Sequence, residues 1–314
     1  MPEPVTLDDV RAARERIGGR LPRAPLHSSR TLGERVFLKA ELFQPTGSFK
    51  VRGVLNKLAT LTAEERARGV IGISAGNHAQ ALAWGARQEA LDCLMVMYGG
   101  ASPQKVAATL GYGAHVDQEA DSPATAFERL DDLIAETGRV LVHPFDDPVV
   151  IAGAGTCGLE IVEDLPDVDT VLVACGGGGL VSGIAVAVKA LRPEARVVAV
   201  EPERSTALRS GLEAGEPVPV TPDSIADGLS APFAGTHAVA LCTALRVESM
   251  LVSEGEIEEA FRFLYLRAKL ACEPAAAAAL APLLAGRVDG GTTAVVVSGG
   301  NVSPQTASAI LARA

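Results

Sequence analysis

The chain has 314 residues, 48% of them hydrophobic and 4% aromatic, which is enough for a large core in one large or two moderate domains. Acidic residues number 38 against 28 basic ones, and the net charge of −10 argues against nucleic acid or an acidic membrane surface as a partner. The sequence has no run of about 18 apolar residues and no apolar signal core at its start. Its five scattered cysteines form no CxxC pair. A cytoplasmic protein with reduced thiols is therefore expected.

The predicted elements alternate between short Val- and Ile-rich strands and helices, the pattern of an α/β protein with parallel sheets. A strand, a loop and the first turns of a helix are expected around residues 37–58. The first group that follows has strands at 70–74, 93–98, 114–118 and 140–144, with helices at 78–88, 102–113 and 123–138. The second group has strands at 170–175, 196–202, 247–253 and 293–300, with helices at 180–192 and 255–271 and a helical alanine run at 275–279. The groups meet near 145–150 in HPFDDPVV, a candidate crossover between domains.

A lysine stands inside an apolar turn in the segment GSFKVRG, residues 47–53. Lys50 is predicted near the N-terminus of a helix, where the positive end of the helix dipole lowers the pKa of an ammonium group. A lysine that is often neutral can attack a carbonyl and form a Schiff base. For a single lysine, an ordinary surface position at a helix start is the commoner alternative, so the rest of the chain must decide.

The segment CGGGGL, residues 175–180, follows a predicted buried strand and opens a helix. Four successive glycines let several backbone N–H groups point at one anion, and the helix dipole adds to the attraction. The segment therefore predicts a phosphate site, the alternative being a merely flexible turn. It is not a spaced G-x-G-x-x-G fingerprint, but Glu201 at a later strand end keeps NAD as a weak rival.

Two further polar loops follow predicted strands. In SAGNHAQ, Asn77 can donate to a ring oxygen, and Ser74 with the loop N–H groups could hold a carboxylate. His78 is a catalytic candidate, although a lone histidine at a helix start more often has a structural role. In SGGN, Ser298 can reach a ring nitrogen. Because the carboxyl ends of parallel strands share one edge of a sheet, all these loops are expected to surround one site.

Eight segments taken together identify a family resemblance: LKAELFQPTGSFKVRG, SAGNHAQALA, HPFDDPVVIAGAGT, CGGGGLVSGIA, VEP, IADG, CEPAAA and SGGN. In this order and spacing they resemble the fold type II pyridoxal-phosphate enzymes, in particular the threonine/serine dehydratase and serine racemase group. The resemblance implies two open, twisted, mainly parallel α/β domains with the cofactor in the cleft between them. Residues 1–60 and 148–314 would form the large domain and residues 61–147 the small one. A homo-oligomer, dimer or tetramer, is usual in the group.

The resemblance also implies roles for individual residues. Lys50 would be the Schiff-base lysine and the general base, Asn77 would contact the 3′-oxygen of pyridoxal 5′-phosphate, and Ser298 would face its pyridine nitrogen. The implied cofactor-binding residues are Phe49, Lys50, Asn77, Gly176, Gly177, Gly178, Gly179, Leu180 and Ser298. The implied substrate-binding residues are Ser74, Ala75, Gly76 and His78. The expected reaction is α,β-elimination of water from a 3-hydroxy amino acid of the L-threonine or L-serine type, giving a 2-oxo acid and ammonia.

The sequence departs from the resembled pattern at two positions. Metal-binding members have a carboxylate six residues after the glutamate that matches Glu201, and Ala207 stands there, so no divalent metal is expected. A monovalent cation held by carbonyl groups stays open. Racemases have a serine where this chain has Ala75, which favours the dehydratase over the racemase. A non-catalytic cofactor-binding regulatory protein is the more distant alternative.

Overall fold

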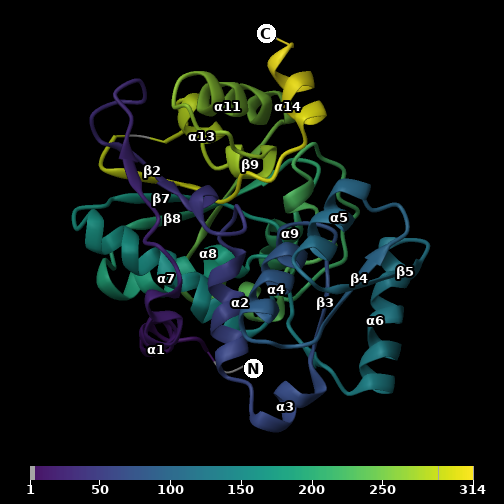
Figure 1. Cartoon of the computed structure of the whole chain (residues 1–314). Coiled ribbons are helices and arrows are strands. Elements are labelled where there is room, and N and C mark those ends of the chain that lie inside the picture. The colour runs from purple at the N-terminus through teal and green to yellow at the C-terminus, as the bar shows by residue number, and fades with distance from the viewer. Residues whose placement is uncertain (1–3, 289, 314) are drawn as a thin grey trace.

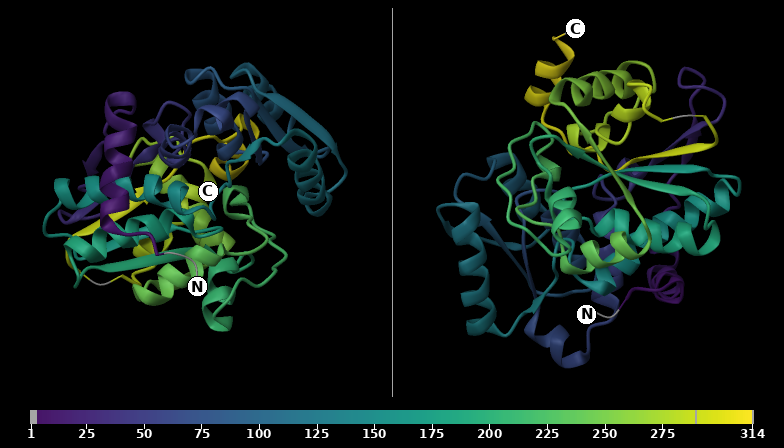
Figure 2. Two further views of the ribbon diagram at one scale, coloured as in Figure 1. Left: turned by 90° about the horizontal axis from the view of Figure 1, so that it is seen from below. Right: turned by 180° about the vertical axis from the view of Figure 1, so that it is seen from behind.

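The computed structural model describes residues 4–288 and 290–313. Two sheets, each flanked by helices, make up the molecule, and nearly all of their strand pairs are parallel (Figures 1 and 2). The prediction of an α/β fold with mainly parallel sheets is thus confirmed. Helix α14 lies near the C-terminus at the top of Figure 1, and α1 lies near the opposite side.

The larger sheet has six strands in the order β1-β2-β10-β7-β8-β9. Only the β1–β2 pair is antiparallel. The strands are β1 (Leu26–Ser28), β2 (Val36–Ala40), β7 (Thr170–Ala174), β8 (Arg196–Pro202), β9 (Glu248–Val252) and β10 (Thr293–Val297). Because β2 and β7 are both neighbours of β10, segments far apart in the sequence end at the same edge of the sheet.

Helices cover both faces of this sheet, and the alternation of side chains along each strand explains why. In β7, Val171 and Val173 join one buried core, while Leu172 and Ala174 join the other. The first core is packed by α7 (Pro148–Asp164), α8 (Gly179–Leu191) and α10 (Thr236–Ala244), with α1 (Leu7–Ile17) outside α7 and α9 (Ala207–Ala214) beside α10. The second is packed by α11 (Glu254–Leu266), α12 (Pro274–Ala277), α13 (Ala281–Leu284) and α14 (Pro304–Leu311).

The smaller sheet has four parallel strands in the order β5-β4-β3-β6. They are β3 (Val70–Ile73), β4 (Cys93–Tyr98), β5 (His115–Ala120) and β6 (Val140–Leu141). Helix α6 (Pro123–Thr137) covers one face, and α4 (Asn77–Gln88) and α5 (Pro103–Gly111) lie on the other, with α3 (Ala63–Arg68) before β3.

Helix α2 (Lys50–Ala59) contacts both halves of the molecule. Its side chains Val51, Val54 and Leu58 pack in the core of the smaller sheet. Its Arg52 points the other way, donates two hydrogen bonds to Glu41 at 2.8 Å, and contacts the Glu160 carboxylate on α7 at 2.7 Å. The first turn of α2 is therefore fixed by a buried charge network.

Several predicted elements are shorter than expected, among them the strand predicted at 293–300, which ends at Val297. The strand predicted at 140–144 is β6 alone, which pairs with β3 at Val140 and Leu141 before the chain turns at His143. The helix predicted at 255–271 ends at Leu266, because the chain turns inward to bury Leu270 and Cys272. The alanine run is helical only to Ala277. All five cysteines are free and buried, and no helix in the described part of the chain combines the length and apolar character needed to cross a membrane.

Candidate active site

Three of the predicted loops follow the neighbouring strands β2, β10 and β7 at one edge of the larger sheet, whereas SAGN follows β3 of the smaller sheet. The loop after β2 is joined to the loop after β10 by hydrogen bonds from the Phe49 N–H to the Ser298 carbonyl at 3.0 Å and from the Gly300 N–H to the Gly47 carbonyl at 2.9 Å. Ser298 itself is almost completely buried. The structure therefore places Lys50 and Ser298, which are far apart in the sequence, on adjoining loops.

Lys50 is the first residue of α2, and no side chain caps this helix end. Its Nζ donates a hydrogen bond to the Pro144 carbonyl at 2.6 Å and lies 5.1 Å from the centre of the Phe49 ring. Burial lowers the pKa of Lys50 to about 8, although the negative charge of Glu273 acts in the opposite direction. Within the described residues, no carboxylate lies at ion-pair distance from its Nζ. Lys50 is thus a lysine with an appreciable neutral fraction near physiological pH.

The glycine loop, residues 176–179, joins β7 to α8. Gly178 has φ of +90°, which favours glycine, and a Cβ there would lie 2.5 Å from Ala238. A Cβ at Gly177 would lie 2.4 Å from the ring of Phe145, the residue after Pro144. The loop therefore lies directly beside the carbonyl that contacts Lys50.

The backbone N–H groups of this loop are available to a ligand. Those of Gly176, Gly177, Gly179 and Leu180 donate no hydrogen bond within the described residues. They precede or begin a helix of more than three turns, so the helix dipole adds to their attraction for an anion. The loop can accept a phosphate group without any charged side chain.

Asn77 lies at the start of α4 between two polar side chains. Its Nδ2 donates to Glu273 Oε1 at 2.7 Å, and its Oδ1 accepts a hydrogen bond from Asn301 Nδ2 at 2.8 Å. Asn301 also donates to the Thr46 carbonyl at 2.8 Å. Asn77 is therefore tied to the loops after β2 and β10, close to Ser298.

The other residues of the SAGNHAQ segment have internal partners. The hydroxyl of Ser74 accepts the N–H of Gly76 at 3.0 Å, and Ala75 offers no polar group. The His78 ring is only 2% exposed, and its Nε2 bonds the Val142 carbonyl at 2.8 Å. Burial and the charge of Lys50 lower the pKa of His78 to about 3, so the ring is neutral at physiological pH.

Glu201, considered for a metal, serves a helix end instead. It is completely buried, and its carboxylate accepts the N–H groups of Leu208 at 2.7 Å and Arg209 at 2.9 Å in the first turn of α9. Burial raises its pKa to about 7 despite these hydrogen bonds. The described residues contain no group of three or more His, Cys, Asp or Glu side chains arranged to hold a metal ion.

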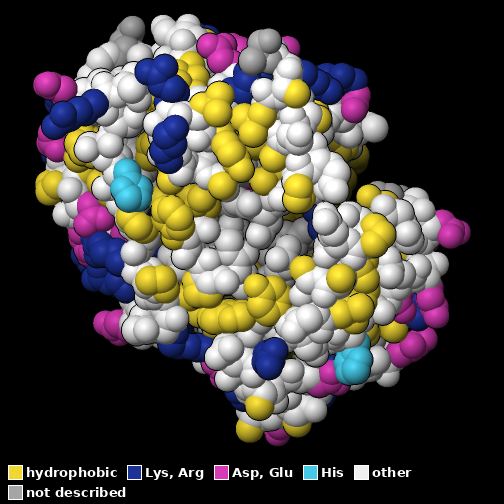
Figure 3. Space-filling model, turned by 45° about the horizontal axis from the view of Figure 1, so that its top comes forward, with side chains coloured by type: hydrophobic (Ala, Val, Ile, Leu, Met, Phe, Trp, Pro, Cys, Tyr) yellow, Lys and Arg dark blue, Asp and Glu magenta, His cyan; other side chains and the backbone are white. Residues whose placement is uncertain are grey.

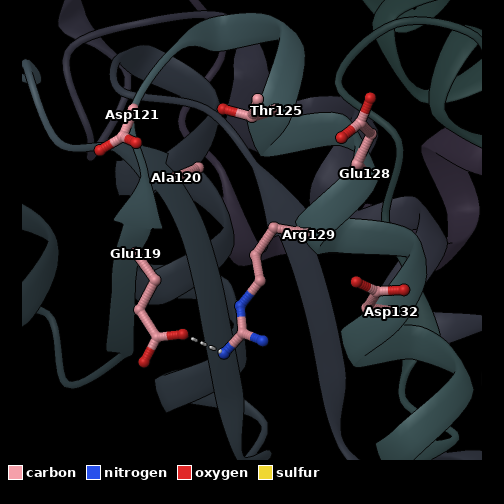
Figure 4. Close-up of a pocket in the computed structure, with 7 residues that line it drawn as sticks. All are labelled: Glu119, Ala120, Asp121, Thr125, Glu128, Arg129 and Asp132. Carbon is pink, nitrogen blue, oxygen red and sulfur yellow. Dashed lines mark ion pairs between the residues drawn. The ribbon is translucent and has the colours of Figure 1, made fainter.

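Two surface hollows lie outside these loops. A groove of about 660 Å³ is lined by residues of β1, its flanks and the segment after α11. A smaller acidic hollow lies between β5 and α6, where Arg129 pairs with Glu119 at 2.9 Å (Figure 4). Neither contains a residue predicted for the site. In the view of Figure 3, charged side chains lie mainly at the periphery, and the hollow in the middle of that face is mostly white.

Sequence reasoning missed Glu273, Asn301 and Pro144. The only signal for Glu273 was an acidic residue in the otherwise apolar segment CEPAAA, and Asn301 stands in SGGN, where no role was predicted for it. Pro144 acts through its carbonyl, which no side-chain pattern reveals.

Comparison with known sequences gives matches along most of the chain. A family model described as "Pyridoxal-phosphate dependent enzyme" matches residues 17–299. L-threonine dehydratase catabolic TdcB of Escherichia coli strain K12 is 40% identical over 317 residues, covering 98% of this chain and 96% of the relative. L-threonine ammonia-lyase of Thermotoga maritima is 41% identical over 306 residues, covering 95% of this chain and 76% of the relative.

Solved structures match over nearly the whole chain as well. The structure of maize serine racemase superposes with a TM-score of 0.92 at 32% identity, covering 99% of this chain and 98% of that one. The crystal structure of a T.th. threonine deaminase has a TM-score of 0.89 at 39% identity, covering 95% of this chain and 99% of that one.

Proposed function

We propose that this chain, which belongs to the family of pyridoxal-phosphate dependent enzymes, is an ammonia-lyase that eliminates water from 3-hydroxy amino acids of the L-threonine and L-serine type. The observation that carries the proposal is the 40% identity to an L-threonine dehydratase over nearly the full length of both chains. A lysine of lowered pKa beside a set of available loop N–H groups supports it. The family resemblance predicted from the eight segments is confirmed by this membership.

The residues at the site fit pyridoxal 5′-phosphate. The glycine loop has N–H groups free for the phosphate, and a Cβ at Gly177 or Gly178 would meet neighbouring atoms at 2.4 and 2.5 Å, so the loop depends on glycine. Asn77 would donate to the ring oxygen, and Ser298 would face the ring nitrogen. Residues Gly176, Gly177, Gly178, Gly179 and Leu180 would hold the phosphate, and Phe49 and Lys50 would complete the site.

Each side chain has a defined task in the elimination. When bound, the cofactor supplies an electron sink that makes the substrate Cα–H acidic. Lys50 would hold the cofactor through Nζ, and the freed amine would then remove the Cα proton as general base. The Pro144 carbonyl orients Nζ at 2.6 Å. Overall, the Cα proton taken up by Lys50 and the Cβ hydroxyl would leave as one water while a carbon–carbon double bond forms. Addition of a water to the released enamine would then give a 2-oxo acid and ammonia.

Ser298 supports elimination rather than a long-lived carbanion. A hydroxyl at the ring nitrogen would not hold a proton there as a carboxylate does, so the cofactor would supply only a modest electron sink. Prompt loss of the β-hydroxyl would then be favoured. The segment Ser74, Ala75, Gly76 and His78 is proposed to face the substrate carboxylate.

A serine or related amino acid racemase is the second candidate, since maize serine racemase has a closely similar structure. Racemisation needs an acid–base group on the substrate face opposite Lys50. Ala75 has no proton to give, and His78 has its Nε2 on the Val142 carbonyl and a pKa lowered to about 3. These two observations favour the ammonia-lyase. A non-catalytic regulatory role is the most distant alternative.

The wider organisation of the protein is also a proposal. Residues 1–60 and 148–314 form the large domain and 61–147 the small one, which agrees with the separation of the two sheets. A cytoplasmic homo-oligomer, dimer or tetramer, fits the five free cysteines and the family. No divalent metal is required, because Ala207 offers no carboxylate and Glu201 caps α9. A monovalent cation held by carbonyl groups stays open.

The test is a panel of 3-hydroxy amino acids incubated with the holoenzyme, with and without a chelator. Ammonia and 2-oxo acid are expected from L-threonine or L-serine, unchanged by the chelator, with little inverted amino acid on chiral chromatography. D-serine formed as fast as pyruvate would favour the racemase. Activity lost with the chelator and restored by a divalent ion would overturn the metal proposal.

A further inference from the structure

Glu273 occupies a space that Gly299 keeps open. It is 5% exposed, and it lies at the start of α12, where its N–H donates to the Gly299 carbonyl at 3.1 Å. A Cβ at Gly299 would lie 2.4 Å from its Oε1, and a Cβ at Gly228 would lie 3.8 Å from the same oxygen. Any side chain at position 299 would push the carboxylate away from Asn77. The segments IADG, CEPAAA and SGGN thus meet at one carboxylate.

The partners of Asn77 determine which way its amide faces. A carbonyl can only accept a hydrogen bond, so the Asn301 atom that contacts the Thr46 carbonyl must be the donor Nδ2. The same Nδ2 contacts the side chain of Asn77. Asn77 must therefore present its oxygen to Asn301. Its Nδ2 then faces Glu273, which accepts one hydrogen at 2.7 Å. The second hydrogen of Nδ2 has no acceptor within the described residues.

We propose that Glu273 is a positioning residue of the active site: together with Asn301 it fixes the Asn77 amide so that its second Nδ2 hydrogen is free to donate to the ring oxygen of the cofactor. This role rests on the proposed function, since it assigns a ligand to Asn77. It adds two residues to the site, and it explains why a carboxylate is buried where no cation of residues 4–288 and 290–313 lies at ion-pair distance. Without Glu273 the amide loses the acceptor that holds its donor side in place.

The charged groups that face Glu273 come from three elements. Lys50 lies on α2, Lys105 on α5, and Asp227 on the short helix η3 (Asp227–Leu229), where it pairs with Lys105. Burial raises the pKa of Glu273 to about 7, and the hydrogen bond from Asn77 opposes this rise. At the pH where Lys50 titrates, about 8, Glu273 is mostly ionised, and its charge raises the pKa of Lys50. Neutralising Glu273 should therefore lower the pKa of Lys50.

Two substitutions separate the geometric role from the charge. Glu273→Gln keeps an oxygen that can accept from Asn77 but removes the charge, whereas Glu273→Ala removes both. We expect cofactor affinity of the holoenzyme to stay within about threefold of wild type in Glu273→Gln and to fall about tenfold or more in Glu273→Ala. Glu201→Ala is the matched control, because Glu201 is also buried with a pKa raised to about 7 but caps α9.

A second readout uses the apoprotein and needs no bound cofactor. The pH dependence of Lys50 reductive methylation, followed by mass spectrometry, reports the pKa of its amine. We expect the midpoint to move down by about half a unit in both Glu273 variants and to stay unchanged in Glu201→Ala. This shift would not follow from a general loss of stability.

The outcomes distinguish this role from the proposed function. If wild type binds the cofactor and releases ammonia from L-threonine, but Glu273→Ala binds as tightly as wild type, the positioning role is overturned and the function stands. Equal weakening in Glu201→Ala would also overturn it, because the effect would then be a general cost of losing a buried carboxylate. A wild-type protein that forms no visible cofactor band would overturn the proposed function, and the ligand assigned to Asn77 with it.

Discussion

Two lysines in the N-terminal part of the chain, Lys39 completely buried and Lys50 partly buried, have opposite surroundings. Lys39, on β2, has no exposed surface, and its Nζ donates to the Ala24 carbonyl at 2.7 Å and contacts Glu160 at 2.7 Å. Lys50, on α2, donates to the Pro144 carbonyl, and no carboxylate lies at ion-pair distance from it within the described residues. The difference teaches that burial alone does not make a reactive amine. Burial lowers the pKa of an amine where no contacting carboxylate compensates for the lost hydration, as at Lys50.

The two environments are connected through Glu160. This carboxylate contacts Lys39 at 2.7 Å and Arg52 at 2.7 Å, and Arg52 lies in the same first turn of α2 as Lys50. The ion pairs of Glu160 thus fix helix α2, which carries the amine of Lys50. A buried ion pair of this kind is costly to break, because removal of one partner leaves a charge uncompensated.

Substitution of Lys50 should have the largest effect. We expect Lys50→Ala to lose the visible cofactor band and to reduce ammonia release from L-threonine by about 10³-fold or more, because both the covalent attachment and the general base are removed. Ammonia release measured beside a Lys189→Ala control checks this. Normal turnover by Lys50→Ala would remove Lys50 from the chemistry.

Substitution of Lys39 should act on stability instead. We expect Lys39→Met to lower the free energy of unfolding by about 3 kcal/mol or more, because Glu160 loses one of its buried cations. Urea unfolding of the apoprotein measures this, with Lys189→Met expected within about 0.5 kcal/mol of wild type. If Lys39→Met lost ammonia release but kept the stability of wild type, Lys39 would have a catalytic role and the two lysines would not differ as described.

The glycine loop, which lies beside Lys50, should contribute strongly to the affinity for the cofactor. In Gly178→Val the side chain meets Ala238 and φ of +90° is strained, so we expect the affinity for pyridoxal 5′-phosphate to fall about tenfold or more. Gly215→Val is the matched control: φ is +77°, but nothing lies within 4 Å of its Cβ. Equilibrium titration of the apoproteins compares the two, and equal affinities would count against a phosphate at this loop.

The pH dependence of cofactor attachment should show a smaller effect of the surroundings of Lys50. The neutral amine is the nucleophile, and burial lowers the pKa of Lys50 from 10.5 to about 8. The rate of recombination of apoprotein with cofactor should therefore rise about tenfold per pH unit below this value and level off above it. A stopped-flow profile measures the rate. A rate still rising steeply at pH 10 would mean an ordinary lysine.

Much of the site could be predicted because parallel strands end at one edge. The glycine loop and SGGN follow the neighbouring strands β7 and β10, so their meeting required only the strand order, whereas SAGN follows β3 of the smaller sheet and reaches them through the contacts of Asn77 with Glu273 and Asn301. Helix α7 was not predicted, since it is buried on nearly all sides and its apolar residues show no helical period. Glu273 and Asn301 could not be assigned, because their contacts with Asn77 join residues that no local pattern connects.

The lysine that holds the cofactor can be identified directly by chemical labelling. The holoenzyme is reduced with borohydride and digested, and the peptide carrying the reduced cofactor is sequenced by mass spectrometry. We expect the visible band to bleach and the label to be on Lys50, with none on Lys39. A label on any other lysine, or full ammonia release from a protein that carries no label, would contradict it.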